Sequence, residues 1–417
     1  MKKTLIIVGI ALLFSLIAWF FLRDTSTTTP VATIPTGGSP FGTAGGDINI
    51  PALGTETVGE TTAFDDQNIS SEETLFRISN TPSAGFVVFA RGGDTIVRYV
   101  DRGTGHISEV TLPKTGATTL AKKKITNNTL PKIYEAHFRS DGSSVLLRFL
   151  EGDTDVVKNT SLTLTAPKST LASTSSPQAT DALYTVAAAN LRGGLSSILV
   201  GTGNSLYYVL KDNSSIGSSD FIGGSQRTLF SSAFNNWRLG KFGNNLLVYT
   251  KASATAAGYA YSLPSGGGSL TKLLGPLPGL TVVANNSGTR LLYSYNEGGI
   301  PKLFVKNLEN NAVSEILPAS LAEKCVWSTK NINVFFCGTP LGGLTSSEPD
   351  NWYLGITHFT DYLWRFDTVS ESAQLVSEPK TEFDMDIDVS DLRVTTQEDF
   401  LVFINKRDQT LWAVRLQ

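Results

Sequence analysis

Residues 136–149 read AHFRSDGSSVLLRF, which is an apolar strand, a tight polar turn and a second apolar strand. The Ser-Asp-Gly turn suits a hairpin because Asp, Asn and Gly tolerate the backbone conformations that tight turns require. The same pattern returns at residues 283–295, VANNSGTRLLYSY, and at residues 392–405, LRVTTQEDFLVFIN. The chain is therefore expected to repeat one β-hairpin unit.

Four weaker copies bring the number of units to seven, at a spacing of about 42 to 67 residues that is typical of propeller blades with loop insertions. They lie at residues 79–91, 190–208, 237–251 and 325–337. Short apolar segments follow several units and are expected as third strands: residues 206–209, 303–305, 363–366 and 411–414. The pattern predicts an all-β fold, a β-propeller of about seven four-stranded blades. Two β-sandwiches are the alternative, which recurrence across the whole region disfavours.

The end of the chain offers a way to close such a ring. Gln417 comes just after the expected third strand at residues 410–416, so the last blade lacks its outer strand. Residues 74–78, TLFRI, precede the first complete unit and alternate in polarity as a strand does. We expect them to supply the missing strand.

The N-terminus carries a different signal. Residues 4–22 read TLIIVGIALLFSLIAWFFL and contain no charge. As a helix this run is about 28 Å long, close to the thickness of a bilayer core. Lys2 and Lys3 precede it, which places the N-terminus in the cytoplasm and the rest outside the membrane. A cleaved signal peptide is the alternative, but the apolar run is long and bulky residues occupy the position of a cleavage site.

The sequence thus divides into three parts: an anchor at residues 1–23, a stalk at residues 24–72 and the propeller at residues 73–417. The stalk is rich in Thr, Gly and Pro and cannot bury enough apolar surface to order itself. With 34 Lys and Arg against 37 Asp and Glu, the net charge is −3, so we expect no recruitment of nucleic acid. No cofactor motif is present, because the Gly-rich turns lack the residues of a phosphate loop.

The two cysteines stand in one hairpin unit. Cys325 and Cys337 flank the stretch VWSTKNINVFF, whose midpoint, Asn331, follows the polar residues expected to turn. Directly opposed residues of an antiparallel pair lie about 4.5 or 5.5 Å apart, within disulfide range. Export favours a disulfide over two buried thiols.

Few residues of the sequence suit catalysis. The three histidines, His106, His137 and His358, lie beside no nucleophile motif. Residues 383–389 alternate apolar and acidic side chains, so a strand there would carry three aspartates on one face: Asp384, Asp386 and Asp388. Calcium is a minor alternative for this set, because the glycine and glutamate of a calcium loop are missing. A polar strand facing the propeller channel is the preferred interpretation.

A long insertion, residues 341–351, precedes Trp352 and Tyr353. We expect it to form a loop over one face and to make a binding surface of Trp352, Tyr353 and His358, since loops on rigid scaffolds commonly carry binding. Bulky aromatic residues between blades more often serve packing, and both interpretations stay open from the sequence.

Several motifs together resemble one protein group. They are Cys325-Val326-Trp327-Ser328, Pro349-Asp350-Asn351-Trp352-Tyr353 with Gly355, Gly258-Tyr259-Ala260-Tyr261 and Leu363-Trp364. This order resembles membrane-anchored, WD40-like or TolB-like β-propeller proteins of candidate-phyla-radiation bacteria. The resemblance covers the whole expected propeller, and it implies fold and location but no activity or site residues.

The expected function is that of a binding or scaffold module, tethered to the membrane through residues 4–22 and facing a protein or glycan outside it. The alternative is an envelope glycan hydrolase or lyase that uses acidic residues of the channel. The missing catalytic motifs favour the binding module.

Overall fold

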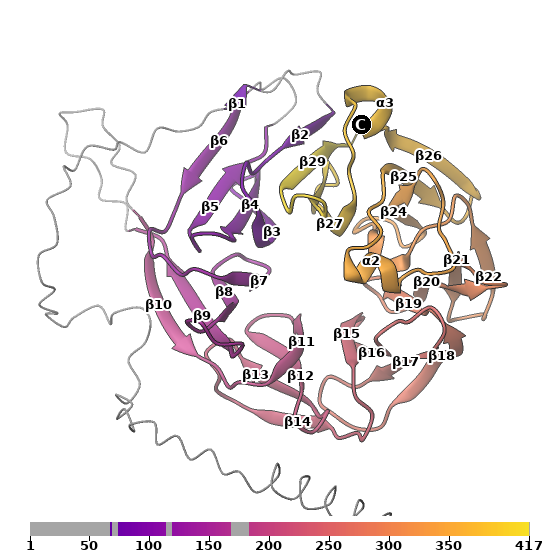
Figure 1. Cartoon of the computed structure of the whole chain (residues 1–417), viewed down its shortest axis with the longest axis horizontal. Helices are drawn as coiled ribbons and strands as arrows, with labels where there is room; N and C mark the ends of the chain where they lie inside the picture. Colours follow the sequence, from indigo (N-terminus) through magenta and orange to yellow (C-terminus); the bar gives the residue numbers. More distant parts are fainter. Residues whose placement is uncertain (1–66, 69–73, 114–118, 168–182, 417) are drawn as a thin grey trace, which may run out of the picture. The chain divides into compact units, whose positions relative to one another are not determined.

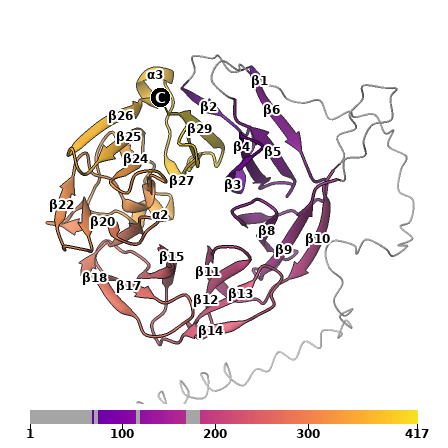
Figure 2. The same ribbon diagram turned by 180° about the vertical axis from the view of Figure 1, so that it is seen from behind.

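The computed structural model describes residues 67–68, 74–113, 119–167 and 183–416, all within the second of two compact units of the chain, Phe41–Gln417. These residues form seven antiparallel sheets arranged around a central axis (Figure 1). Each sheet is one blade, and from behind the same order runs in the opposite sense (Figure 2). The all-β propeller predicted from the hairpin repeat is confirmed, with seven blades.

The first four blades follow the chain from the channel outward, except that blade 1 gains a fifth strand at its outer edge. Blade 1 holds β3 (Ser83–Arg91), β4 (Asp94–Asp101), β5 (Ile107–Thr111), β6 (Thr119–Lys124) and the added β1 (Gln67–Asn68). Blade 2 holds β7 (Ile133–Phe138), β8 (Ser144–Leu150), β9 (Val157–Thr165) and β10 (Thr185–Asn190). Blade 3 holds β11 (Leu195–Val200), β12 (Ser205–Leu210), β13 (Ile216–Asp220) and β14 (Arg227–Phe230). Blade 4 holds β15 (Trp237–Phe242), β16 (Asn245–Thr250), β17 (Ala257–Leu263) and β18 (Thr271–Pro278).

The last three blades keep the same order, with short helices between strands. Blade 5 holds β19 (Thr281–Ala284), β20 (Arg290–Glu297), β21 (Ile300–Asn307) and β22 (Val313–Ile316), and the 3-10 turn η1 (Ala322–Lys324) follows. Blade 6 holds β23 (Cys325–Trp327), β24 (Val334–Pro340), β25 (Asp361–Asp367) and β26 (Ser372–Ser377), with α2 (Asp350–Leu354) between β24 and β25. Blade 7 follows α3 (Pro379–Phe383) and holds β27 (Val389–Val394), β28 (Phe400–Asn405), β29 (Leu411–Arg415) and β2 (Leu75–Arg77).

The turn of the unit at residues 136–149 shows why this sequence folds as a hairpin. Gly142 adopts φ 70° and donates its N–H to the carbonyl of Arg139, at 2.9 Å. A Cβ at this position would lie 2.6 Å from the ring of Phe89 in blade 1. Gly142 therefore serves both the turn and the contact between two blades.

The core lies between the blades. Within the described residues, seven clusters of buried apolar side chains each join one blade to the next, and the last of them joins blade 7 to blade 1. The closing cluster includes Phe76 of β2, Phe86 of β3 and Phe400 of β28. Each blade buries both of its faces against its neighbours, so the core is complete only when all seven blades are in place.

The ring closes as residues 74–78 predict. β2 pairs with β29 in antiparallel register, with Leu75 opposite Val414 and Phe76 opposite Ala413. β2 thus becomes the outer strand of a blade whose other three strands are β27, β28 and β29. This prediction is confirmed.

Two details differ from the sequence expectations. Residues 206–209 belong to β12, the second strand of blade 3, and not to a third strand, because β11 begins only at Leu195. Residues 67–68, within the range expected to be stalk, pair with β6 as β1. The described residues contain no helix long and apolar enough to cross a membrane, and the anchor expected at residues 4–22 lies outside them.

Candidate functional site

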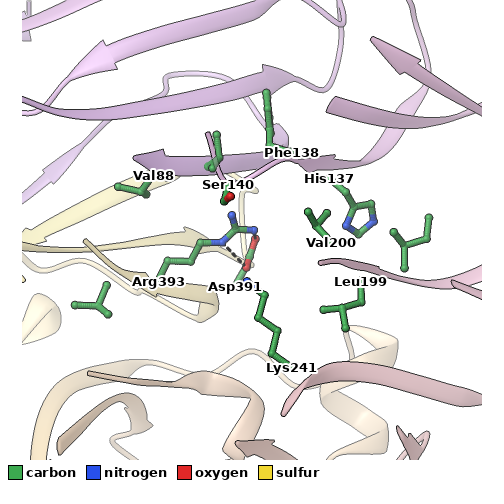
Figure 3. Close-up of a pocket in the computed structure, with 12 residues that line it drawn as sticks. Val88, His137, Phe138, Ser140, Leu199, Val200, Lys241, Asp391 and Arg393 are labelled. Atoms are coloured by element: carbon green, nitrogen blue, oxygen red, sulfur yellow. Dashed lines mark hydrogen bonds and ion pairs between the residues drawn. The ribbon is translucent and has the colours of Figure 1, made fainter. Parts of the chain in front are cut away.

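A cavity of about 490 Å³ opens on the central channel, and inner strands from five blades line it. β3, β7, β11, β15 and β27 all contribute, so residues far apart in the sequence meet there (Figure 3). Its volume lies in the usual range for ligand pockets. The polar side chains of the lining are His137, Ser140, Lys241, Asp391 and Arg393.

A β-bulge in β27 places two of these residues. The register with β28 shifts between Ser390 and Arg393, and Asp391 adopts φ 47°. An aspartate tolerates this left-handed conformation better than most residues. Bulges of this kind re-aim side chains near functional sites.

Arg393 is held from two sides. Its guanidinium makes a bidentate pair with Asp391, at 3.1 Å from Nε to Oδ1 and 2.8 Å from Nη2 to Oδ2. Its Nη1 also donates to the carbonyl oxygen of Phe86 in β3, at 2.6 Å. Arg393 therefore joins blade 7 to blade 1 and fixes one wall of the cavity.

Lys241, near the end of β15, has no hydrogen-bond or ion-pair partner among the described residues, and its side chain is exposed toward the channel (Figure 3). The pKa of Lys241 is lowered, first because surrounding protein displaces water and second because the positive charge of Arg393 is near. The cavity thus holds a cation that no carboxylate of the described chain neutralises. An anion that entered would relieve both effects.

His137 lies at the opposite wall, on β7. Its Nε2 is 2.9 Å from Oε1 of Glu135, whose other oxygen accepts a hydrogen bond from Arg148. Burial alone raises the pKa of Glu135, but His137 and Arg148 outweigh burial and lower it to about 2. Glu135 is thus ionised, and both of its carboxylate oxygens have partners. It lines a second cavity, of about 400 Å³, that shares Ile198 with the first.

The three aspartates of the expected acidic strand do not line this cavity, and the expectation of a strand there is wrong. The chain forms α3, Asp384 ends that helix at φ 52°, and β27 begins only at Val389. The segment must carry the chain from the outer strand β26 to the inner strand β27, so it cannot run as part of a sheet.

The aspartates also differ in environment. Asp384 is exposed and pairs with Lys380 at 2.7 Å, while Asp386 accepts a hydrogen bond from Thr360 at 2.9 Å. Asp388 is fully buried. Within the described ranges no group of three or more acidic, histidine or cysteine side chains is arranged to hold a metal ion.

Asp388 belongs to a buried charge cluster centred on Lys324. The ammonium of Lys324 lies 2.6 Å from Oδ1 of Asp388 and 2.8 Å from Oδ2 of Asp361, and it also donates to the carbonyl oxygen of Val389 at 2.9 Å. All three charged side chains have 0% exposure. Burial raises the pKa of Asp361 to about 6, although Lys324 opposes the shift. We name these three residues the Lys324 cluster.

The insertion between β24 and β25 packs on the Lys324 cluster. The indole N–H of Trp352 donates to Asp388 at 3.0 Å, and the ring lies 4.8 Å from Nζ of Lys324. Trp352 is only 5% exposed, so it packs in the interior, which is the other interpretation that the sequence left open. Asp388 needs a donor in the interior, and the indole supplies it.

The other two residues of the expected surface lie at its rim. Tyr353 is half-buried, and its hydroxyl donates to Oε2 of Glu323 at 2.8 Å, while His358 is exposed. Burial raises the pKa of Glu323, and it also raises the pKa of Tyr353. Of the three residues, only His358 is available to a partner without rearrangement.

The disulfide predicted from the hairpin is present. Cys325 and Cys337 are directly opposed in β23 and β24, with Cα atoms 4.0 Å apart. Both are buried against blade 5. The disulfide joins the inner two strands of the blade that carries the insertion.

Lys241 and Arg393 could not be predicted as site residues from the sequence. Both lie in predicted hairpin units, at residues 237–251 and 392–405. In the sequence, each is only a basic residue within a predicted inner strand. The folded ring brings β15 and β27 to the same cavity, and only there do the two residues form a site.

Several solved structures match this chain at low sequence identity and with TM-scores below 0.5. No protein-family model and no curated protein matches the sequence. Similar solved structures include virginiamycin B lyase from Staphylococcus aureus, with 11% identity, a TM-score of 0.48 and coverage of 82% of this chain and 98% of that chain. YCF48 bound to a D1 peptide shows 10% identity and a TM-score of 0.48 over 87% and 100% of the two chains. An oligogalacturonate lyase in complex with manganese shows 9% identity and a TM-score of 0.44 over 81% and 97%.

Proposed function

We propose that the protein is a membrane-tethered, extracytoplasmic binding module whose channel cavity takes an anionic group of a protein or glycan. Lys241 carries the proposal, as an accessible cation without a partner in the described chain beside the guanidinium of Arg393. Lys241 and Arg393 place two positive charges at one open cavity, and a ligand with an anionic group would offset their mutual repulsion.

The alternative of a glycan hydrolase or lyase has weaker support. Hydrolysis by paired carboxylates needs one carboxyl group that carries a proton and a second one nearby. In the described lining of the main cavity, Asp391 is held by Arg393, and the low pKa of Glu135 in the adjoining cavity keeps it ionised. These contacts favour binding over acid catalysis.

The tether is proposed from residues 4–22, whose length and lack of charge suit a bilayer. Protease added to spheroplasts should cleave the exported part, and deletion of residues 4–22 should release the protein from the membrane fraction. Full protection from protease would contradict the proposed location.

A binding measurement tests the cavity. Full-length protein in zwitterionic nanodiscs would be titrated with three anionic probes: inorganic phosphate, polyglucuronate and a peptide with a free C-terminus. At least one should bind with an affinity that falls as salt rises, since salt screens the attraction. Lys241→Met should weaken that binding at least tenfold, because methionine keeps the apolar stem and removes the charge. Equal binding by the variant would overturn the proposal.

A further inference from the structure

The cavity is apolar as well as cationic. Aliphatic side chains from three inner strands line it around Lys241: Val88 of β3, Ile198, Leu199 and Val200 of β11, and Val394 of β27. All five are half-buried, so each keeps part of its surface open. A ligand that fits must therefore carry an anionic group and an apolar body side by side.

The backbone of the cavity offers a second kind of contact. β3, β7, β11, β15 and β27 are each the innermost strand of a blade and pair with a neighbour on their outer side. Their inner edges face the channel, where backbone N–H and C=O groups are in position to bond an extended chain. An extended peptide matches these edges in spacing and in donor and acceptor pattern.

A glycan fits the same walls less well. Its many hydroxyl groups would each lose water on binding and need a new partner. Of the polar side chains of the lining, Asp391 and Arg393 already bond each other, which leaves three for a ligand: His137, Ser140 and Lys241. A carboxylate attached to an aliphatic residue needs one cation and one apolar wall, and the cavity places both together.

Resting on the proposed function, we infer that the ligand is the C-terminus of a peptide with an apolar last residue. Its α-carboxylate pairs with the ammonium of Lys241, and its last side chain packs against Leu199, which lies on the face of β11 that packs against β15. Capture of a terminal carboxylate next to a strand edge is a known mode of peptide recognition. The α-carboxylate and the side chain of the last residue are attached to the same Cα atom, so one bound residue makes both contacts.

The test uses hexapeptides labelled at the N-terminus, of sequence Gly-Ser-Gly-Ala-Ala followed by Val, Leu, Ser or Lys, each as the free acid and as the amide. Fluorescence anisotropy would follow their binding to the full chain in nanodiscs. The acids that end in Val or Leu should bind at least tenfold more tightly than their amides and than the acids that end in Ser or Lys. Lys241→Met should lower their affinity at least tenfold.

Lys272→Met provides the matched control. Lys272 lies on β18, the outermost strand of the same blade, and is exposed. This variant should bind as the wild type does. Thermal unfolding of Lys241→Met should match that of the wild type, which would show that lost binding is not lost folding.

The outcomes separate the two proposals. Equal binding of acids and amides, or no peptide binding up to about 1 mM, which is a weak limit, overturns the inference. If polyglucuronate or phosphate then binds in a way that depends on Lys241, the proposed function stands without the peptide. If no anion binds, or if Lys241→Met binds every probe as the wild type does, both proposals fail.

Discussion

Two lysines near the channel differ in how their positive charge is accommodated: one is buried and paired, and the other is exposed and unpaired within the described chain. Lys324 has 0% exposure and lies within 2.8 Å of two carboxylates and within 2.9 Å of a backbone carbonyl oxygen. Lys241 is exposed to the cavity, and no ion pair joins it to the described chain. A charge that is removed from water is stable only when protein groups pair with it. A charge in a cavity open to solvent stays hydrated and remains available to a ligand.

The two lysines also mark two sides of the ring. Lys324 lies where blades 5, 6 and 7 meet the insertion, and the Lys324 cluster fixes that junction. Lys241 faces strands of blades 1, 2, 3 and 7 across an open cavity. We therefore expect the first side to contribute to stability, and the binding that we propose lies on the second side.

The largest expected effect is on the first side. Lys324→Met leaves Asp361 and Asp388 buried without their cation, which should lower the free energy of unfolding by about 3–5 kcal/mol. Urea denaturation followed by tryptophan fluorescence measures the loss. Hydrogen exchange should also rise in residues 341–360, because Trp352 and the N–H of Phe359 bond Asp388. A loss below about 1 kcal/mol would place Lys324 with ordinary surface charges.

Reduction of the disulfide should have the next effect. Cys325 and Cys337 close a loop with a sequence separation of 12, and opening so short a loop should lower stability by about 3 kcal/mol. Unfolding in the presence and absence of a reductant gives this value without any mutation. Mass mapping without a reductant should first recover the two cysteines in one linked peptide. Unchanged stability on reduction would show that the hairpin of blade 6 holds without its crosslink.

A pH series tests the Lys324 cluster more finely. The pKa of Asp361 is about 6 in the folded protein against an ordinary 3.8, so folding takes up a proton between these values. The contribution of Asp361 to stability is therefore complete below about pH 4 and is lost as pH rises through about 6. The loss should be about 3 kcal/mol, because the pKa of Asp361 rises from 3.8 to about 6 and each pKa unit corresponds to about 1.4 kcal/mol.

Asp361→Asn isolates this contribution from that of other carboxylates. Asparagine keeps an oxygen that accepts from Lys324 and from the N–H of Val389. The variant should gain stability relative to the wild type between pH 4 and pH 7. Parallel pH profiles for the two proteins would show that Asp361 does not titrate in this range.

The smallest expected effect is on the second side. Lys241→Met should change the free energy of unfolding by less than about 0.5 kcal/mol, because the lysine makes no contact that the fold needs. The same urea denaturation measures it beside Lys324→Met. A loss of several kcal/mol would break the comparison and make Lys241 a structural residue.

Much of the fold could be predicted from local sequence. Hairpin turns repeat the same chemistry, so residues 136–149 and their copies gave the units and their number, and the polarity of residues 74–78 gave the closing strand. The opposition of Cys325 and Cys337 followed from the centre of one hairpin. Each of these features depends on residues close in sequence or on a simple count of strands.

The site depends on contacts that no local pattern contains. The alternation at residues 383–389 resembles a strand, but the chain there crosses from the rim of blade 6 to the channel, so Asp384, Asp386 and Asp388 point to different surroundings. Trp352 follows an exposed insertion, yet its indole is buried because its N–H donates a hydrogen bond to the buried Asp388. Lys241 becomes a site residue only through the four other strands that surround it.

The pairing of β2 with β29 also sets an order of events during synthesis. Roughly 340 residues separate the two strands, so at ordinary elongation rates β2 waits on the order of 20 to 70 seconds for its partner. Until then the growing domain is an arc with two unpaired ends, and each end offers strand edges and apolar surface to other chains. A ribosome that stalls within blade 7 would release an arc that cannot close. The segment that closes the ring, β29, is thus the one that protects the whole domain from aggregation.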